Sequence, residues 1–182
     1  MELKNELELI EKERNVYRAV EFIEDEKNQS LDNFLRVLFV LLDFLVDGQY
    51  TQDEHDFFST KIKEIFGKAK LNFSSNSDFL FFVGIMIYVA EWYFGIDNID
   101  EAKIMLEDAL KSDPDNIVYK WGYYSITDQR AEVNTEIKQL ISNQILGDNL
   151  ILEWLKSKGL LGEYILGIIQ GTYEATQPHN FI

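Results

Sequence analysis

Apolar residues recur at intervals of three and four positions along most of this chain. Between residues 3 and 27 they are Leu3, Leu7, Ile10, Val16, Val20 and Ile23, with glutamate and lysine between them. This spacing puts apolar side chains on one face of an α-helix, and no segment shows the sustained alternation of a β-strand. Because the intervening segments are short, the pattern predicts an all-α protein of antiparallel helical hairpins.

Capping residues and helix breakers predict about eight to nine helices. Thr51 and Glu54 have the spacing of a capping box, in which each side chain bonds the backbone N–H of the other residue. Gly48 and Pro114 are expected to end the helices before them, and a break near Asn15 would divide the first helix. The predicted helices cover residues 3–27, 31–46, 52–70, 78–94, 100–111, 117–126, 129–144, 149–157 and 160–170, with caps at Asn116 and Asp128.

Length and composition indicate one folded domain. A chain of 182 residues with 46% hydrophobic residues is too apolar for disorder and long enough to bury a core without disulfides. We expect this domain to cover residues 1–171, followed by a C-terminal tail at 172–182. The segment 79–96 is apolar except for Glu91, but this carboxylate and the lack of flanking basic residues favour a buried helix over a membrane span.

The N-terminal residues and the cysteine content favour a cytoplasmic location. The first six residues, Met-Glu-Leu-Lys-Asn-Glu, have neither the basic opening nor the apolar run of a secretion signal. The chain has no cysteine, so it does not need an oxidising compartment. We therefore expect the protein in the cytoplasm.

The negative charge of the chain indicates the kind of partner it binds. The formal net charge is −15, and residues 1–56 alone hold 15 acidic against 6 basic side chains. Such a charge repels nucleic acid and anionic membranes and attracts a basic protein. The predicted partner-binding residues are acids at expected helix ends or loops: Asp25, Glu26, Asp53, Glu54, Asp56, Asp97, Asp100 and Glu101.

Residues 99–124 carry small and large residues at a characteristic spacing: Ala102, Leu106 and Ala109, followed by Pro114. This spacing resembles the second helix and exit turn of a tetratricopeptide repeat, in which the alanines let two helices approach closely. Ala90 and Tyr93 stand where the motif places a small residue and an aromatic one on the first helix. The resemblance covers residues 79–114, with a connection about two residues longer than in the family, and implies stacked hairpins; an irregular helical bundle is the alternative.

Taken whole, the chain resembles the small acidic helical immunity proteins that bacteria encode beside polymorphic toxins, including those of contact-dependent growth inhibition systems. The shared features are length, acidity, lack of cysteine and an aromatic-rich helical composition. The resemblance implies a protein that binds one toxin domain, commonly a cationic nuclease, and blocks its active site or substrate groove. We expect a monomer before binding. A tetratricopeptide-like adaptor or chaperone holding a peptide in a helical groove is the alternative, and an all-helical enzyme is a third hypothesis.

Candidate catalytic and metal-binding residues are few. Asp53, His55 and Asp56 are close in sequence, but His55 points away from the acids, and the helix dipole explains acids in a first turn. Residues 113–116 lack the glycine and final glutamate of a calcium loop. Glu91 is the best candidate for a general acid, although a glutamate at the edge of a buried face explains it. We predict no metal, no cofactor and no catalytic residue.

Aromatic residues gather in segments 79–94 and 119–124, whereas Phe57 and Phe58 are expected inside the fold. The first segment holds too many rings for one buried stripe: Phe79, Phe81, Phe82, Tyr88, Trp92, Tyr93 and Phe94. Some of them are therefore expected to face a groove or a partner. Aromatic side chains rimmed by acids are typical of the binding hot spots of protein interfaces.

Overall fold

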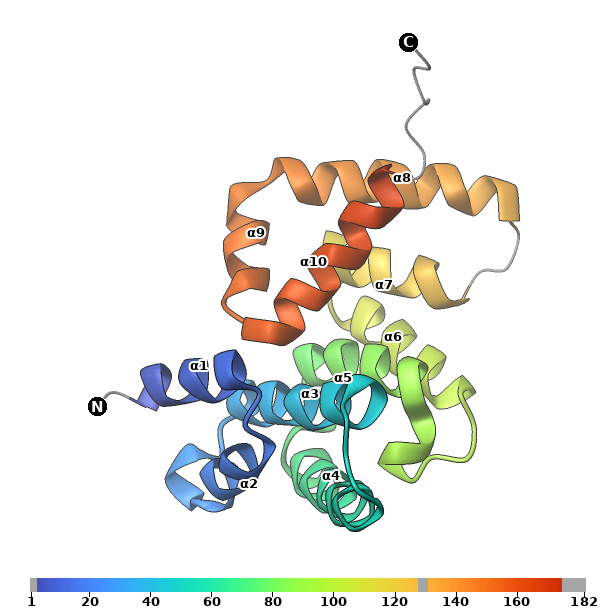
Figure 1. Ribbon diagram of the computed structural model, residues 1–182. Helices are drawn as coiled ribbons and strands as arrows, with labels where there is room; N and C mark the ends of the chain where they lie inside the picture. Colours follow the sequence, from blue (N-terminus) through green and yellow to red (C-terminus); the bar gives the residue numbers. More distant parts are fainter. Residues whose placement is uncertain (1–2, 128–130, 175–182) are drawn as a thin grey trace.

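The computed structural model describes residues 3–127 and 131–174, and this part of the chain is helical without β-strands (Figure 1). It contains ten α-helices and two short 3-10 helices, so the all-α prediction is confirmed with slightly more helices than expected. The α-helices are α1 Leu3–Glu13, α2 Val16–Glu24, α3 Leu31–Asp47, α4 Gln52–Phe73, α5 Ser77–Ala90, α6 Asp100–Ser112, α7 Ile117–Thr127, α8 Ala131–Gly147, α9 Asn149–Lys156 and α10 Gly159–Glu174. The 3-10 helices are η1 Glu26–Asn28 and η2 Glu91–Phe94.

The segment predicted at residues 3–27 contains a break. Arg14 adopts the left-handed conformation with a φ of 50°, which ends α1. The side chain of Asn15 then accepts a hydrogen bond from the backbone N–H of Arg18 at 3.1 Å and caps α2. α1 and α2 are therefore separate helices, divided at the position where a break was expected.

Several predicted helix boundaries are wrong. α4 continues to Phe73, into a segment expected as a loop. The helix predicted at 78–94 is divided, because α5 ends at Ala90 and the chain continues as η2 until Gly95, whose φ of 68° favours glycine. α10 extends to Glu174, so residues 172–174 of the expected tail belong to this helix. The predicted cap at Asp128 and residues 175–182 lie outside the described residues.

α3 lies at the centre of the fold. Residues 34–42 are continuously buried, and Leu45 is buried one turn further on. α2, α4, α5 and α10 pack around this helix. Full burial of an aliphatic or aromatic side chain contributes about 1.5–3 kcal/mol, so α3 supplies much of the folding free energy. The expectation of a nearly enclosed helix is confirmed.

α5 and α6 form a closely packed hairpin. A Cβ atom added to Gly84 of α5 would lie 3.1 Å from Leu106 Cγ and 3.3 Å from Ala102 O. The small residue opposite the alanine-leucine pattern is therefore Gly84 and not Ala90. Ala90 is the last residue of α5 and Tyr93 lies in η2, so the two residues stand at and beyond the end of the first helix of this hairpin.

α7 packs against the same hairpin through a glycine. A Cβ atom added to Gly122 would lie 2.5 Å from Phe81 Cε2 of α5 and 3.4 Å from Leu106 Cδ2 of α6. The backbone of α7 thus lies directly against two side chains of the hairpin. In Figure 1, α8, α9 and α10 form the upper part of the molecule, and α10 also packs on α3 and α1.

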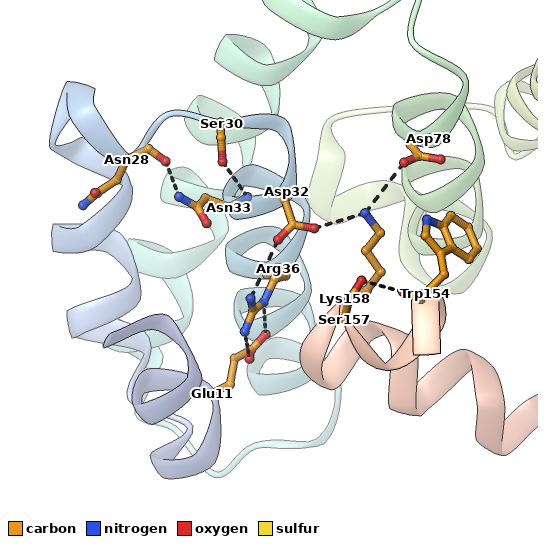
Figure 2. Close-up of polar contacts among 10 residues, drawn as sticks. All are labelled: Glu11, Asn28, Ser30, Asp32, Asn33, Arg36, Asp78, Trp154, Ser157 and Lys158. Carbon is orange, nitrogen blue, oxygen red and sulfur yellow. Dashed lines mark hydrogen bonds and ion pairs between the residues drawn. The ribbon is translucent and has the colours of Figure 1, made fainter. Parts of the chain in front are cut away.

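Charged side chains join the first helices to the last ones; Figure 2 shows them, and we call Glu11, Asp32, Arg36, Asp78 and Lys158 the charge network. Arg36 donates to both carboxylate oxygens of Glu11, with 2.9 Å between Nε and Oε1, and both side chains are buried. Asp32 accepts from Lys158 Nζ at 3.1 Å and lies 3.7 Å from Arg36 Nη1. Lys158 also lies 3.7 Å from Asp78. Each charge has a partner of opposite sign, as burial requires.

One helical stretch among the described residues, Ser77–Phe94, is long and apolar enough to cross a membrane by length and composition. It covers α5 and η2, and 61% of it is buried inside the molecule. Packing of this kind is compatible with the core helix of a soluble protein.

Candidate functional site

The first turn of α4 is fixed by the predicted capping box. Thr51 Oγ1 accepts a hydrogen bond from the backbone N–H of Glu54 at 3.3 Å, and Glu54 Oε2 accepts from the backbone N–H of Thr51 at 2.9 Å. These bonds to Thr51 hold the pKa of the Glu54 carboxyl below its usual value, so Glu54 stays ionised. Asp53 and Asp56 are exposed beside it. Three of the predicted partner-binding acids therefore share one rigid helix start.

Aromatic rings surround this helix start in an unbroken series of contacts. Successive ring centroids lie between 4.9 Å (Tyr17 and Phe58) and 6.3 Å (Tyr17 and Phe57) apart. We call this series the aromatic row: Trp92, Tyr93, His55, Tyr50, Phe44, Phe58, Tyr17 and Phe57. It includes residues of α2, α3, α4 and η2 and of the α3–α4 connection.

Much of the aromatic row faces solvent. The exposed fraction is 57% for Trp92, 51% for Tyr17, 44% for Phe57 and 37% for Tyr50, whereas Phe58 is fully buried beneath them. Tyr17 and Phe57 adjoin each other, and adjoining exposed aromatic side chains are unusual on a monomeric protein and indicate a site for another molecule.

Hydrogen bonds hold the rings in place. The hydroxyl groups of Tyr50 and Tyr93 both donate to the backbone carbonyl of Leu45, at 2.9 and 3.1 Å. The Tyr17 hydroxyl donates to Glu54 Oε1 at 3.2 Å. Desolvation and the Glu54 carboxylate raise the pKa of Tyr17 above its usual value, so its hydroxyl remains a donor at neutral pH. Because these hydroxyl groups already order their rings, binding of a partner costs less side-chain conformational entropy, which favours affinity.

The other predicted acids lie apart from the aromatic row. α2 and α4 run side by side in the same direction, because Tyr17 contacts Glu54 and Glu24 pairs with Lys61 at 2.9 Å. Asp25 and Glu26 follow Glu24 and are therefore about 10 Å further along α4 than Glu54, at 1.5 Å per residue. Asp25 is also partly neutralised by Lys27, 2.7 Å away.

Asp97, Asp100 and Glu101 are exposed at the start of α6. The connection before them passes α4 on its other side, since a Cβ atom added to Gly95 would lie 3.8 Å from Lys63 Cδ. Asp100 pairs with Lys103 at 2.7 Å. The structure thus brings Asp53, Glu54 and Asp56 together with the exposed rings and leaves the other five acids on its flanks.

Sequence reasoning missed several residues of this surface. Phe57 was expected inside, but it lies on the flank of α4 that faces Tyr17, with ring centroids 6.3 Å apart. Tyr17 and Tyr50 belong to other segments and carried no signal of their own. Some aromatic residues of segment 79–94 were expected at the surface, and Trp92 is exposed. Tyr119 and Trp121 of the second aromatic segment are only 3% and 1% exposed, so they are buried in the fold.

The structure also places the residues that the sequence offered for metal binding and for acid–base chemistry. Among residues 3–127 and 131–174, no group of three histidine, cysteine or acidic side chains is arranged to hold a metal ion. The expectation that His55 points away from the acids is wrong, because His55 Nδ1 lies 3.1 Å from Asp56 Oδ1. This contact and Gln52 lower the pKa of the Asp56 carboxyl. Glu91 is partly exposed at the start of η2 and not enclosed in an apolar pocket.

Comparison with protein-family models, curated proteins and solved structures gives no match for this chain. The fold and the surface define a protein whose described residues are all-helical, with a partly exposed row of aromatic rings beside three carboxylates.

Proposed function

We propose that this protein is a non-enzymatic binding protein that recognises a basic protein through the aromatic row and the adjacent acids Asp53, Glu54 and Asp56. The observation that supports this most is the exposure of Trp92 and Tyr17, at 57% and 51%. Both belong to the aromatic row, and the Tyr17 hydroxyl contacts the Glu54 carboxylate. Exposed aromatics rimmed by acids match the hot spots that bind cationic surfaces.

The acids and the rings would contribute to different steps of binding. Carboxylates at the surface attract a basic partner over long distance and raise the association rate. Rings that become desolvated in the complex slow dissociation, because their contacts must be broken before the partner leaves. A net charge of −15 makes nucleic acid and anionic membranes unsuitable partners.

Within this class, we propose an immunity protein that neutralises the cationic C-terminal domain of a toxin, acting as a cytoplasmic monomer until it binds and requiring no cofactor. The proposal joins the acidic and aromatic surface to the resemblance in length, charge and helical composition described above. Binding at the α4 surface would then cover the active surface of the toxin domain.

The proposal predicts that a large secreted protein is encoded beside this gene, and the test uses the C-terminal domain of that protein. Association and dissociation rates are measured at low salt and at about 0.5 M salt, where screening extends less than about 5 Å. Reversal of Asp53 and Asp56 to lysine should slow association about tenfold at low salt, with a smaller effect at high salt. The control is the reversal of Asp113 and Asp115 to lysine, which changes the net charge by the same amount. Both residues are exposed between α6 and α7. Equal effects of both double variants would show that total charge alone matters, and failure of the domain to bind would overturn the toxin proposal.

A second candidate is an adaptor that holds a peptide in a helical groove. The supporting observation is a depression of about 360 Å³ between the start of α7 and α9, lined by Ile117, Val118, Ile151, Trp154 and the strongly exposed Leu150. Leu150→Glu would abolish peptide binding in this groove and leave toxin binding at the α4 surface unchanged.

A further inference from the structure

A second cavity lies on another part of the molecule. It has a volume of about 570 Å³, is open to solvent and is lined by residues of α1, α3, the end of α9 and the start of α10. This volume is within the range of small-molecule sites, about 300–1,000 Å³. Its walls are mainly polar, unlike the aromatic row: they include Glu8, Lys12, Glu153, Lys156 and Glu163.

The inner wall of this cavity is built from the buried pair Glu11–Arg36 of the charge network (Figure 2). The backbone of α10 closes tightly on this pair, since a Cβ atom added to Gly159 would lie 2.3 Å from Glu11 Oε1. Gly159 also has a φ of 60°, which favours glycine. The wall is therefore rigid, and the partners of Glu11 and Arg36 are already in place.

The charges of the cavity divide into paired and unpaired groups. Arg36 is neutralised by Glu11, and Lys156 pairs with Glu153 at 3.2 Å. Glu8, Lys12 and Glu163 form no ion pair within residues 3–127 and 131–174. Glu8 and Lys12 are one turn apart on α1, and Glu163 lies on α10. The charges without an ion pair are thus two carboxylates and one ammonium group, carried by α1 and α10, and Glu8 also acts electrostatically on Arg36.

We infer that this cavity binds a basic amino acid, either free or at the end of a peptide chain. Such a molecule carries two cationic groups and one carboxylate when free, which is the complement of Glu8, Glu163 and Lys12. At a peptide terminus it keeps its side-chain cation and one of the two backbone charges. The carboxylates contact the cationic groups, and Lys12 contacts the ligand carboxylate where one is present. This site is separate from the α4 surface and does not depend on the proposed function.

The experiment is a titration of the full-length ¹⁵N-labelled protein, followed by the amide signals of Gly159 and Leu160. The probes are L-arginine, L-lysine, L-citrulline, agmatine, and the tripeptides Arg-Ala-Ala and Ala-Ala-Arg. Citrulline lacks the side-chain charge of arginine, and agmatine lacks its carboxylate. We expect arginine or lysine to bind with a dissociation constant on the order of 1 mM, as suits a ligand of this size, and citrulline to bind at least about tenfold more weakly. Binding of the tripeptides but not of the free amino acids would assign the site to a chain terminus.

Variants test whether the named charges form the site. Glu163→Gln should weaken arginine binding about tenfold or more, whereas Glu21→Gln, an exposed glutamate on α2, should leave it unchanged. Lys12→Met should remove the preference for arginine over agmatine. The inference is overturned if no probe shifts the signals of Gly159 and Leu160, if citrulline binds as well as arginine, or if Glu163→Gln and Glu21→Gln behave alike.

Discussion

At the scale of single residues, the exposed rings and the buried hydroxyl groups have different tasks. Trp92 contacts only one other ring of the aromatic row, Tyr93, and more than half of its surface faces solvent. Tyr119 is buried, and its hydroxyl donates to Asp78 Oδ1 at 2.5 Å. The first residue is therefore suited to binding a partner, and the second to holding α7 against α5.

Trp92→Ala tests the binding role of the aromatic row. Because the side chain is largely exposed, the free energy of unfolding should change by less than about 1 kcal/mol. Dissociation from the toxin domain should accelerate at least about tenfold, as expected for an aromatic hot spot. Tyr88→Ala, which removes an exposed aromatic outside the row, is the matched control, with thermal unfolding and dissociation rates as the measurements. Similar dissociation rates for both variants would contradict the assignment.

The buried hydroxyl group of Tyr119 makes the free energy of unfolding depend on pH in the alkaline range. Burial, followed by the bond to Asp78, raises the pKa of this tyrosine above its usual value, so the folded state favours the neutral hydroxyl. The stabilisation is complete below the unfolded pKa near 10 and is lost as pH rises through the higher folded pKa. Tyr119→Phe should cost about 1.5–3 kcal/mol at neutral pH, the contribution of a hydrogen bond to a charged acceptor. The difference in unfolding free energy between the wild-type protein and Tyr119→Phe should become smaller above pH 10.

The prediction is checked by measuring the denaturant midpoints of the wild-type protein and of Tyr119→Phe. The measurements are made at pH 7 and between about pH 9 and 11, on both sides of the ordinary tyrosine pKa. Tyr88→Phe, an exposed tyrosine on the same α5 helix that carries Asp78, serves as the control. A stability difference for Tyr119→Phe that stays constant with pH would show that the hydroxyl contributes packing alone.

At the scale of helices, small residues determine how closely elements approach. Gly84 lets α6 lie against α5, and Gly122 lets α7 lie against Phe81. Glycine in a helix interior costs about 0.5–1 kcal/mol relative to alanine, so close approach must compensate for it. Other helical glycines have no such neighbour: a Cβ atom added to Gly167 of α10 would meet nothing within 4 Å.

Gly122 and Gly167 are expected to respond in opposite ways when each is replaced by alanine. Gly122→Ala should lower the free energy of unfolding by about 1–3 kcal/mol, because the added methyl group would overlap the ring of Phe81, which is fully buried. Gly167→Ala should raise it by up to about 1 kcal/mol through higher helix propensity. Chemical denaturation measures both. Stabilisation by Gly122→Ala would mean that α7 can move away from the hairpin without cost.

At the scale of the whole molecule, the charge network connects parts of the chain that are distant in sequence. Asp32 and Lys158 are separated by 126 positions, yet they lie 3.1 Å apart. Glu11 of α1 and Arg36 of α3 extend the connection to the N-terminal helix. Burial opposes the charge on Arg36, but the carboxylates of Glu11, Asp32 and Glu8 together outweigh it and raise the pKa of the guanidinium group. The charge network therefore favours one arrangement of the outer helices around α3.

A double-mutant cycle tests this arrangement. Arg36→Met and Glu11→Met should each cost about 3–5 kcal/mol in unfolding free energy, because each leaves a buried charge without its partner. The double variant should cost less than the sum of the two, with a coupling of about 1 kcal/mol or more. The exposed pair Arg14–Asp43, with 61% of the arginine side chain accessible, is the control, and Arg14→Met should change stability by less than about 1 kcal/mol. Additive effects would show that Glu11 and Arg36 act independently.

The sequence by itself determined the helices and the overall charge. Periodicity and caps such as Thr51 and Asn116 are local, because each helix hydrogen bond or cap joins residues only a few positions apart. The predictions for α3, for the capping box of α4 and for the break near Asn15 were therefore confirmed, while the boundary at Ala90 depended on the surroundings of η2. The acids Asp53, Glu54 and Asp56 could be nominated for the same reason, as charges at a helix start.

Only the tertiary structure decided which distant side chains meet. The aromatic row joins Tyr17 of α2 with Trp92 of η2, and the cavity brings Glu8 of α1 near Glu163 of α10. Helical spacing gives each residue a face of its own helix, but not the helix that packs on that face. Phe57 illustrates the difference: its position on α4 was compatible with the core, and the place of α2 left it 44% exposed beside Tyr17. Those contacts depend on how whole helices pack, which is a property of the complete fold.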